Sequence, residues 1–286
     1  MTPSVRVLAS GLGFLEAPVV LEDDRVAFCD GTRGLVLALA DGAVTEIADV
    51  GGHPNGLALG SDGALYLAQF GTWPQDPVPV APSLVRIERD GRPTTNSTDG
   101  RIAAPNDLAF GPDGRLWITD SGDPDHLEPK RRSGIFALSR AGLELVVELE
   151  PVFANGIGFD PEGRLLWTET ATRRLCRLEN DGTHVVAELP ESHLPDGFAV
   201  AADGRVFVAT LTSRGITVLS ASGELLDHLE VGMEPTNCAF RGSSLVVTAS
   251  TDSSGLPGTG SLFELETDAT PLPLRGGSQT LRIVSA

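Results

Sequence analysis

Residues 54–68 read PNGLALGSDGALYLA, and residues 105–119 read PNDLAFGPDGRLWIT. Each stretch has an apolar run on both sides of an Asp-Gly pair, Asp62-Gly63 in the first and Asp113-Gly114 in the second. This pattern predicts a β-hairpin, because glycine readily adopts the positive φ angle that a tight turn requires. The fold is therefore expected to be built from a repeated antiparallel hairpin.

The hairpin pattern occurs six times along the chain. One position, at the entry of the first strand of each copy, is called the slot here, and it is occupied by Glu16, Asn55, Asn106, Asn155, Asp196 and Thr236. Consecutive slots lie between 39 residues (16 to 55) and 51 residues (55 to 106) apart, and the copy with Thr236 is the most degraded. A period of this length is typical of propeller blades and exceeds that of leucine-rich repeats.

A second hairpin follows the first in each copy, as where residues 35–39 and 44–47 flank Asp41-Gly42. Six copies of four strands predict an all-β fold, a six-bladed β-propeller of four-stranded antiparallel blades. Since the repeats run from end to end, residues 1–286 are expected to form a single six-bladed β-propeller domain. Closing the ring requires pairing of N- and C-terminal strands, and the strand-like residues 5–8 and 280–284 are the expected pair.

Composition limits the partners and the compartment. The formal net charge of -18 argues against nucleic-acid binding, which needs a basic face. No apolar run approaches the ~20 residues of a membrane span, and the first residues do not resemble a secretory signal, so we expect a cytoplasmic protein. Cys29, Cys176 and Cys238 are widely separated and are expected to be buried and reduced. The oligomeric state is left open.

The slot residues carry the chemistry. The first strand of each propeller blade lines the central channel, so residues at one repeat position converge on a common axis. Carboxylates and amide carbonyls are the ligands of a hard cation such as Ca²⁺ or Mg²⁺, and two carboxylates balance one divalent ion. Without a cation, Glu16 and Asp196 would repel each other and lose hydration. No His or Cys pair is placed for a zinc site. Each asparagine, taken alone, also fits a simple turn-capping role.

At this point the chain resembles the SMP-30/gluconolactonase/LRE-like family of six-bladed propellers. The resemblance covers essentially the whole chain and is carried by residues 14–18 (FLEAP), 105–107 (PND), 154–157 (ANGI) and 195–197 (PDG). It implies a hydrolase that opens a small-molecule lactone at one divalent metal ion held by Glu16, Asn155 and Asp196. It also implies that Asn106 contacts metal or substrate and that Asp196 is the general base. Ca²⁺ is the favoured ion, with Mg²⁺, Mn²⁺, Zn²⁺ or Fe²⁺ as alternatives because family members differ.

One departure from the family concerns the substrate. Several sugar-lactone members carry an Arg two residues before the Asn that binds substrate, and this chain has Ala104 there. Sugar lactones are therefore less favoured than other small lactones or esters.

Other residues are expected to shape the substrate pocket. Asn55 and His53 are placed near its mouth, and Trp73 stands in a proline-rich loop that either covers the site or bridges two blades. His53 either assists proton transfer or is only hydrogen-bonded. The same metal ring would also serve a phosphotriester hydrolase or a non-hydrolytic isomerase, and a non-catalytic propeller scaffold is the remaining alternative.

Overall fold

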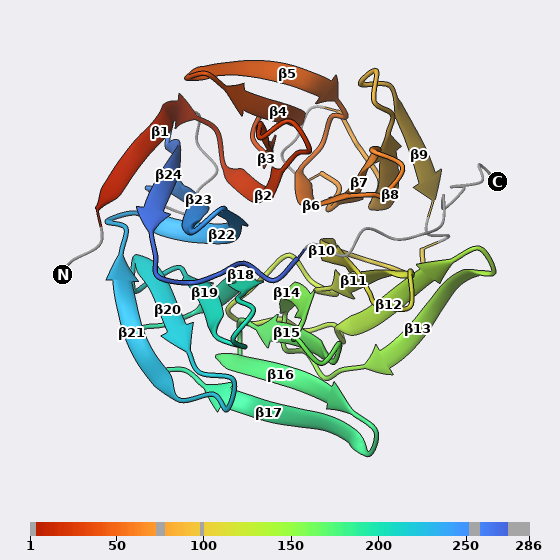
Figure 1. Cartoon of the computed structure of the whole chain (residues 1–286). Coiled ribbons are helices and arrows are strands. Elements are labelled where there is room, and N and C mark those ends of the chain that lie inside the picture. The colour runs from red at the N-terminus through yellow and green to blue at the C-terminus, as the bar shows by residue number, and fades with distance from the viewer. Residues whose placement is uncertain (1–3, 73–77, 98–99, 252–257, 274–286) are drawn as a thin grey trace.

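The computed structural model describes residues 4–72, 78–97, 100–251 and 258–273. In these ranges the chain forms six separate four-stranded antiparallel sheets, which stand around a common axis as the blades of a propeller (Figure 1). The predicted six-bladed β-propeller is therefore confirmed. Within the same ranges, no helix is long and apolar enough to cross a membrane.

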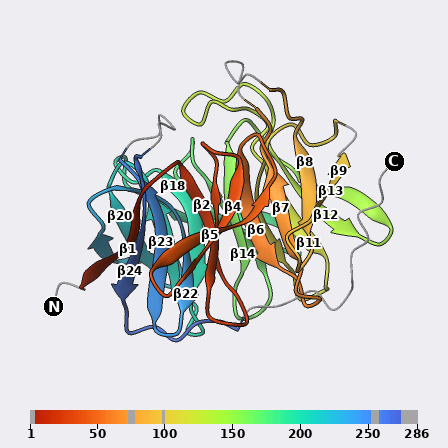
Figure 2. The same cartoon turned by 90° about the horizontal axis from the view of Figure 1, so that it is seen from above.

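Blades 1 to 5 each use four consecutive strands, from the innermost to the outermost. In chain order these strands are β2 (Leu15–Val20), β3 (Val26–Asp30), β4 (Leu35–Ala40), β5 (Ala43–Asp49), β6 (Pro54–Leu59), β7 (Leu65–Gln69), β8 (Ser83–Ile87), β9 (Pro93–Ser97), β10 (Pro105–Phe110), β11 (Leu116–Asp120), β12 (Gly134–Ser139), β13 (Gly142–Glu148), β14 (Ala154–Phe159), β15 (Leu165–Glu169), β16 (Arg174–Glu179), β17 (Gly182–Glu188), β18 (Pro195–Val200), β19 (Val206–Thr210), β20 (Gly215–Leu219) and β21 (Leu225–Glu230). In Figure 2, the same molecule is seen from above, with yellow and green loops rising beyond the strands on one face.

Blade 6 joins the two parts of the chain that are farthest apart in sequence. Its strands are β22 (Glu234–Arg241), β23 (Ser244–Ser250), β24 (Gly260–Glu266) and, outermost, β1 (Val5–Leu12). Closure by an N-terminal and a C-terminal strand is thus confirmed, and the described C-terminal strand lies earlier in the chain than the predicted one. The strand that pairs with β1 is β24, from Val5↔Leu265 to Leu12↔Gly260, whereas residues 280–284 lie outside the described ranges.

Removal of β1 provides a test of this closure. A variant lacking residues 1–12 should melt about 10 °C or more below the full chain, because β24 loses its backbone partner and the buried Leu12 loses its packing. The melting temperature can be measured by differential scanning calorimetry. A matched variant lacking only residues 1–3 keeps β1 and should melt with the full chain. Equal melting of all three proteins would contradict the closure.

The core lies between the blades. The second strand of most blades is buried along its whole length, as in Leu116–Asp120 and Val206–Thr210, because neighbouring sheets cover both faces. Edge-to-face aromatic pairs join one blade to the next: Tyr66 with Phe110, Trp117 with Phe159 and Phe207 with Phe240, with ring centroids 5.2, 5.9 and 5.3 Å apart. The three cysteines are buried and free, as expected.

Each inner strand is interrupted by a β-bulge where it enters the channel. In blades 2 to 5 the slot residue and the residue after it face a single residue of the second strand, as between Pro105↔Asp120 and Leu108↔Ile118. In a regular strand two successive side chains point to opposite faces, and a bulge removes that alternation locally. Two consecutive residues per blade can therefore approach the channel axis.

Candidate functional site

The candidate site lies in the central channel, at the end where the inner strands begin. Glu16, Asn155 and Asp196 come from blades 1, 4 and 5, and each is at least nine-tenths buried, with exposed fractions of 4%, 5% and 6%. The Asn155 side chain donates a hydrogen bond to the Asp196 carboxylate and another to Thr170 Oγ1, 3.1 Å from Asn155 Nδ2. The structure thus brings together the three residues that the resemblance assigned to a metal ion.

Two further polar side chains belong to this site, and the sequence analysis missed both. Asp107 and Asn237 occupy the position after the slot in blades 3 and 6, where the bulges bring them toward the axis. Asn237 Nδ2 donates to Asp107 Oδ2 over 3.2 Å, and the same side chain hydrogen-bonds Glu16. Asp107 is part of the PND motif that the sequence analysis used. In a regular strand, however, the residue after Asn106 would point away from the channel axis, so Asp107 was not expected in the site.

Burial and mutual repulsion dominate the electrostatics. The pKa of Glu16 is raised well above its usual range, first by burial and then by the charges of Asp196 and Asp107. Burial, followed by the charge of Asp107, likewise raises the pKa of Asp196, and burial raises the pKa of Asp107 to about 6. Three carboxyl groups are therefore buried close together in the channel.

No basic side chain neutralises these carboxyl groups in the part of the chain that the structure describes. Among the described residues, no Lys, Arg or His contributes to the pKa shifts of the three carboxyl groups. The same part of the chain holds no group of three or more His, Cys, Asp or Glu side chains arranged as metal ligands. The donor set is instead two carboxylates with an amide oxygen, which fits a hard divalent ion better than a soft one.

Hydroxyl groups from neighbouring blades hold the slot backbone in place. Thr119 Oγ1 donates to the carbonyl of Asn155 over 2.5 Å, and Thr168 Oγ1 donates to that of Asp196 over 2.7 Å. All of these residues are buried. Since each hydroxyl comes from the preceding blade, the spacing between slot residues depends on how the blades pack.

The remaining slot residues divide into two groups. Asn55 Nδ2 donates to Asn106 Oδ1 over 2.9 Å, and Asn106 Nδ2 donates to Ser121 Oγ over 3.0 Å, so these two amides form a chain beside the carboxylates. Thr236, in contrast, donates to the carbonyl of Leu15 over 2.6 Å and holds blade 6 to blade 1. The sixth slot is therefore structural, and Asn237 takes its place in the channel.

Three predicted pocket features have different outcomes. The imidazole of His53 lies beside Gly31 of blade 1. The backbone N–H of His53 donates to the carbonyl of Gly71 over 2.8 Å. Trp73 lies outside the described residues. Ala104 is 2% exposed, and its N–H donates to Asp120 Oδ1 over 2.8 Å, so this position supplies no side-chain donor.

Comparisons with known proteins agree with the fold. The sequence profile of the SMP-30/gluconolactonase/LRE-like region matches residues 87–251, more than half of the chain. A gluconolactonase from Zymomonas mobilis is 24% identical over 290 residues, covering 86% of this chain and 79% of that protein. The structure of a Xanthomonas campestris gluconolactonase superimposes with a TM-score of 0.74 at 23% identity, covering 95% of this chain and 90% of the other.

A calcium-binding protein, regucalcin from Agrobacterium tumefaciens, superimposes with a TM-score of 0.77 at 20% identity, covering 97% of this chain and 98% of the other. At 23% and 20% identity, these two structures show a shared fold and do not establish a shared activity. The profile match spans parts of blades 2 to 6 and includes the slots from Asn106 to Thr236. On this evidence the chain belongs to the SMP-30/gluconolactonase/LRE-like family.

Proposed function

We propose that this protein is a metal-dependent hydrolase that opens small lactones at the end of the channel where the inner strands begin. The observation that carries the proposal is the burial of Glu16 and Asp196 together, with Asn155 beside them and no basic side chain acting on either carboxylate among the described residues. A purely structural role would place uncharged turn residues at these positions. The names of the relatives, two gluconolactonases and a calcium-binding regucalcin, support the lactone and the calcium ion.

Each residue has a distinct proposed role. Glu16, Asn155 and Asp196 would hold the ion, which when bound would polarise the lactone carbonyl as a Lewis acid. Asp196 takes a proton from the attacking water at its carboxylate. Asn155, hydrogen-bonded to Asp196, fixes the orientation of that carboxylate. Asn106 and Asn55, linked to each other, orient the substrate through their amides.

The environment of Ala104 narrows the substrate class. A guanidinium two residues before Asn106 would supply a planar pair of donors to a polyhydroxylated ring. The buried alanine supplies none, and its backbone is occupied by Asp120. We therefore favour lactones with few hydroxyl groups over sugar lactones.

A substrate panel tests the proposal. The protein is assayed by pH-stat with δ-valerolactone, gluconolactone and a phosphotriester, each with Ca²⁺, Mg²⁺, Mn²⁺ or Zn²⁺ and with a chelator. We expect ring opening that needs the ion, with a kcat/KM about tenfold higher for δ-valerolactone than for gluconolactone. Turnover of the phosphotriester alone would favour the second reaction of the same ion, and no turnover with any ion would favour a binding scaffold.

A further inference from the structure

The central channel has a second end, where the six inner strands finish, and this end is hollow. A cavity of about 440 Å³ is lined there by the last residues of β2, β6, β10, β14, β18 and β22. The slot residues Glu16, Asn155 and Asp196 are each the second residue of their strands, near the opposite end. The cavity therefore lies beyond the candidate metal ligands on the same axis, and Asp107 and Asn237 stand between the two.

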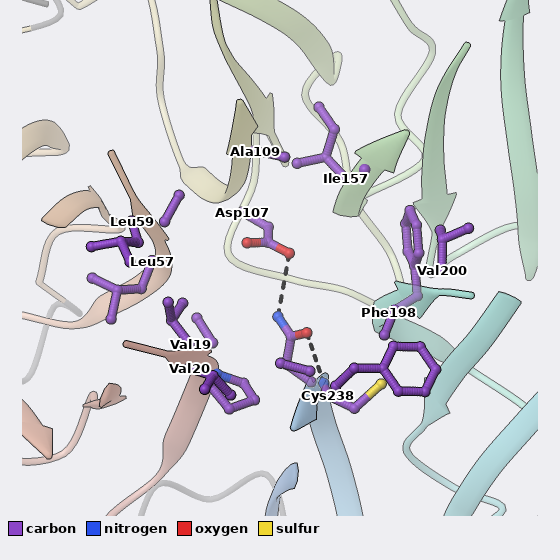
Figure 3. Close-up of a pocket in the computed structure, with 18 of the residues that line it drawn as sticks. Val19, Val20, Leu57, Leu59, Asp107, Ala109, Ile157, Phe198, Val200 and Cys238 are labelled. Carbon is purple, nitrogen blue, oxygen red and sulfur yellow. Dashed lines mark hydrogen bonds between the residues drawn. The ribbon is translucent and has the colours of Figure 1, made fainter. Parts of the chain in front are cut away.

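The repeat itself explains why this end stays open. Three residues after each slot the chain carries Val19, Ala58, Ala109, Gly158, Ala199 and Ala239, so five of the six blades have alanine or glycine there. All six line the cavity. The positions on either side carry larger apolar residues, among them Leu59, Ile157 and Phe198, which form the wall seen in Figure 3. A ring of small residues between rings of larger ones leaves a pocket rather than a filled core.

One strap of chain lies at the mouth. The residues 271–273 pass under blade 5, where the N–H of Leu272 donates to the carbonyl of Val200 over 3.3 Å and Pro271 forms a bridge with Ala201. Pro271, Leu272 and Pro273 all line the cavity. The strap adds apolar surface to one side of an opening that is otherwise made by the blades.

The inner end of the cavity is polar. Asp107 and Asn237 lie there, joined by the 3.2 Å hydrogen bond drawn in Figure 3. Asn237 Oδ1 already accepts the N–H of Cys238 over 2.8 Å, and Asn237 Nδ2 donates to Asp107. The Asp107 carboxylate also accepts the N–H of Leu108 at Oδ1 over 2.8 Å and the N–H of Ile157. With the bond from Asn237 these make three, which leaves about one further lone pair at the end of an apolar pocket. Among the described lining residues, none carries a positive charge.

We propose that this cavity is a second ligand site, which binds a small primary alkylammonium compound with its chain against the apolar wall and its ammonium at Asp107. An apolar pocket with one convergent charged group is the usual form of a small-molecule site. An ammonium group satisfies a carboxylate through charge-assisted hydrogen bonds, which a neutral alcohol makes more weakly and a second carboxylate cannot make. This inference does not rest on the proposed lactone hydrolysis, although Asp107 lies next to the candidate metal ligands Glu16 and Asp196.

Isothermal titration with hexylamine tests the proposal, with hexanol and hexanoate as ligands of matched chain length. We expect saturable binding of one hexylamine per chain, weakened about tenfold or more for hexanol and absent for hexanoate. Ala109→Phe fills the cavity and should abolish binding, while Ala43→Phe makes the same substitution at an exposed position of β5 and should change nothing. If Ala109→Phe fails to fold, as judged by its melting curve, Ala239→Leu fills the ring from blade 6.

Competition separates this site from the metal site. Glu16 and Asp196 balance the charge of the ion and leave Asp107 for the ammonium, so the ion and hexylamine should bind together. Ala109→Phe should leave metal content and lactone turnover unchanged. Absence of saturable binding, equal binding of all three ligands, or hexylamine that displaces the ion and ignores the filled cavity would each overturn the proposal.

Discussion

Purified wild-type protein should carry one divalent ion per chain, and Asp196→Ala should release the ion and slow lactone hydrolysis by about 10³-fold. The substitution removes one of two carboxylates that balance the ion and also removes the proposed base. Glu16→Ala should release the ion equally well, because it removes the other carboxylate. Elemental analysis of the dialysed proteins gives the stoichiometry, and the kinetics are followed with the lactone panel.

Two control variants separate these effects from general damage. Glu46→Ala removes an exposed carboxylate from β5 and should retain both the ion and the activity. Asp196→Asn keeps the size and one amide oxygen, so it should hold the ion more weakly yet lose most of the turnover. A wild-type protein that binds no ion when supplied with one, and loses no activity in either alanine variant, would show that the slot residues are turn residues.

The extent to which the sequence predicted the fold differs between blades. Blades 2 and 3 carry Asp-Gly turns and unbroken apolar runs, so their first hairpins were expected at residues 54–68 and 105–119, where the structure has them. Blade 6 lacks a comparable turn signal. Its strand β24 was not recognised, and residues 280–284 were assigned to closure in its place. A pairing between residues 5 and 265 leaves no local pattern in the sequence, because closure depends on the whole ring.

The site was predicted in its type but not in its full membership. The repeat period aligned Glu16, Asn155 and Asp196, and the structure brings them together. The repeat period predicted that Thr236 would face the channel, and this was wrong. The bulge places Asn237 in the channel and leaves Thr236 between blades 6 and 1. The far cavity was also not predicted, since an alanine in a strand looks the same in sequence whether it fills a core or borders a hollow. Bulges and cavities arise from the registration of neighbouring strands and blades, which one blade's sequence does not contain.

In the presence of a chelator, the metal-free protein should become less stable as the pH rises from about 4 to about 7. Asp107 has a pKa of about 6 in the folded protein, against 3.8 in a free aspartate. Well below pH 3.8 the group is protonated in both the folded and the unfolded chain. Between the two pKa values the unfolded chain gains free energy by ionising, which costs the folded state on the order of 3 kcal/mol from this group alone. The raised pKa values of Glu16 and Asp196 act in the same direction.

A saturating divalent ion should reverse this trend, because it binds the ionised carboxylates of the folded chain. At a thousandfold excess over its dissociation constant it adds about 4 kcal/mol of stability, so its effect on the melting temperature should be larger at pH 8 than at pH 5. Repulsion within an acidic chain also grows with pH, and Asp107→Asn separates the two causes, since it removes only the ionisation of one buried group. The metal-free Asp107→Asn variant should therefore show a shallower loss of stability between pH 4 and pH 7 than the wild type. Identical pH profiles for the two proteins would mean that Asp107 ionises freely in the folded chain and that burial does not raise its pKa.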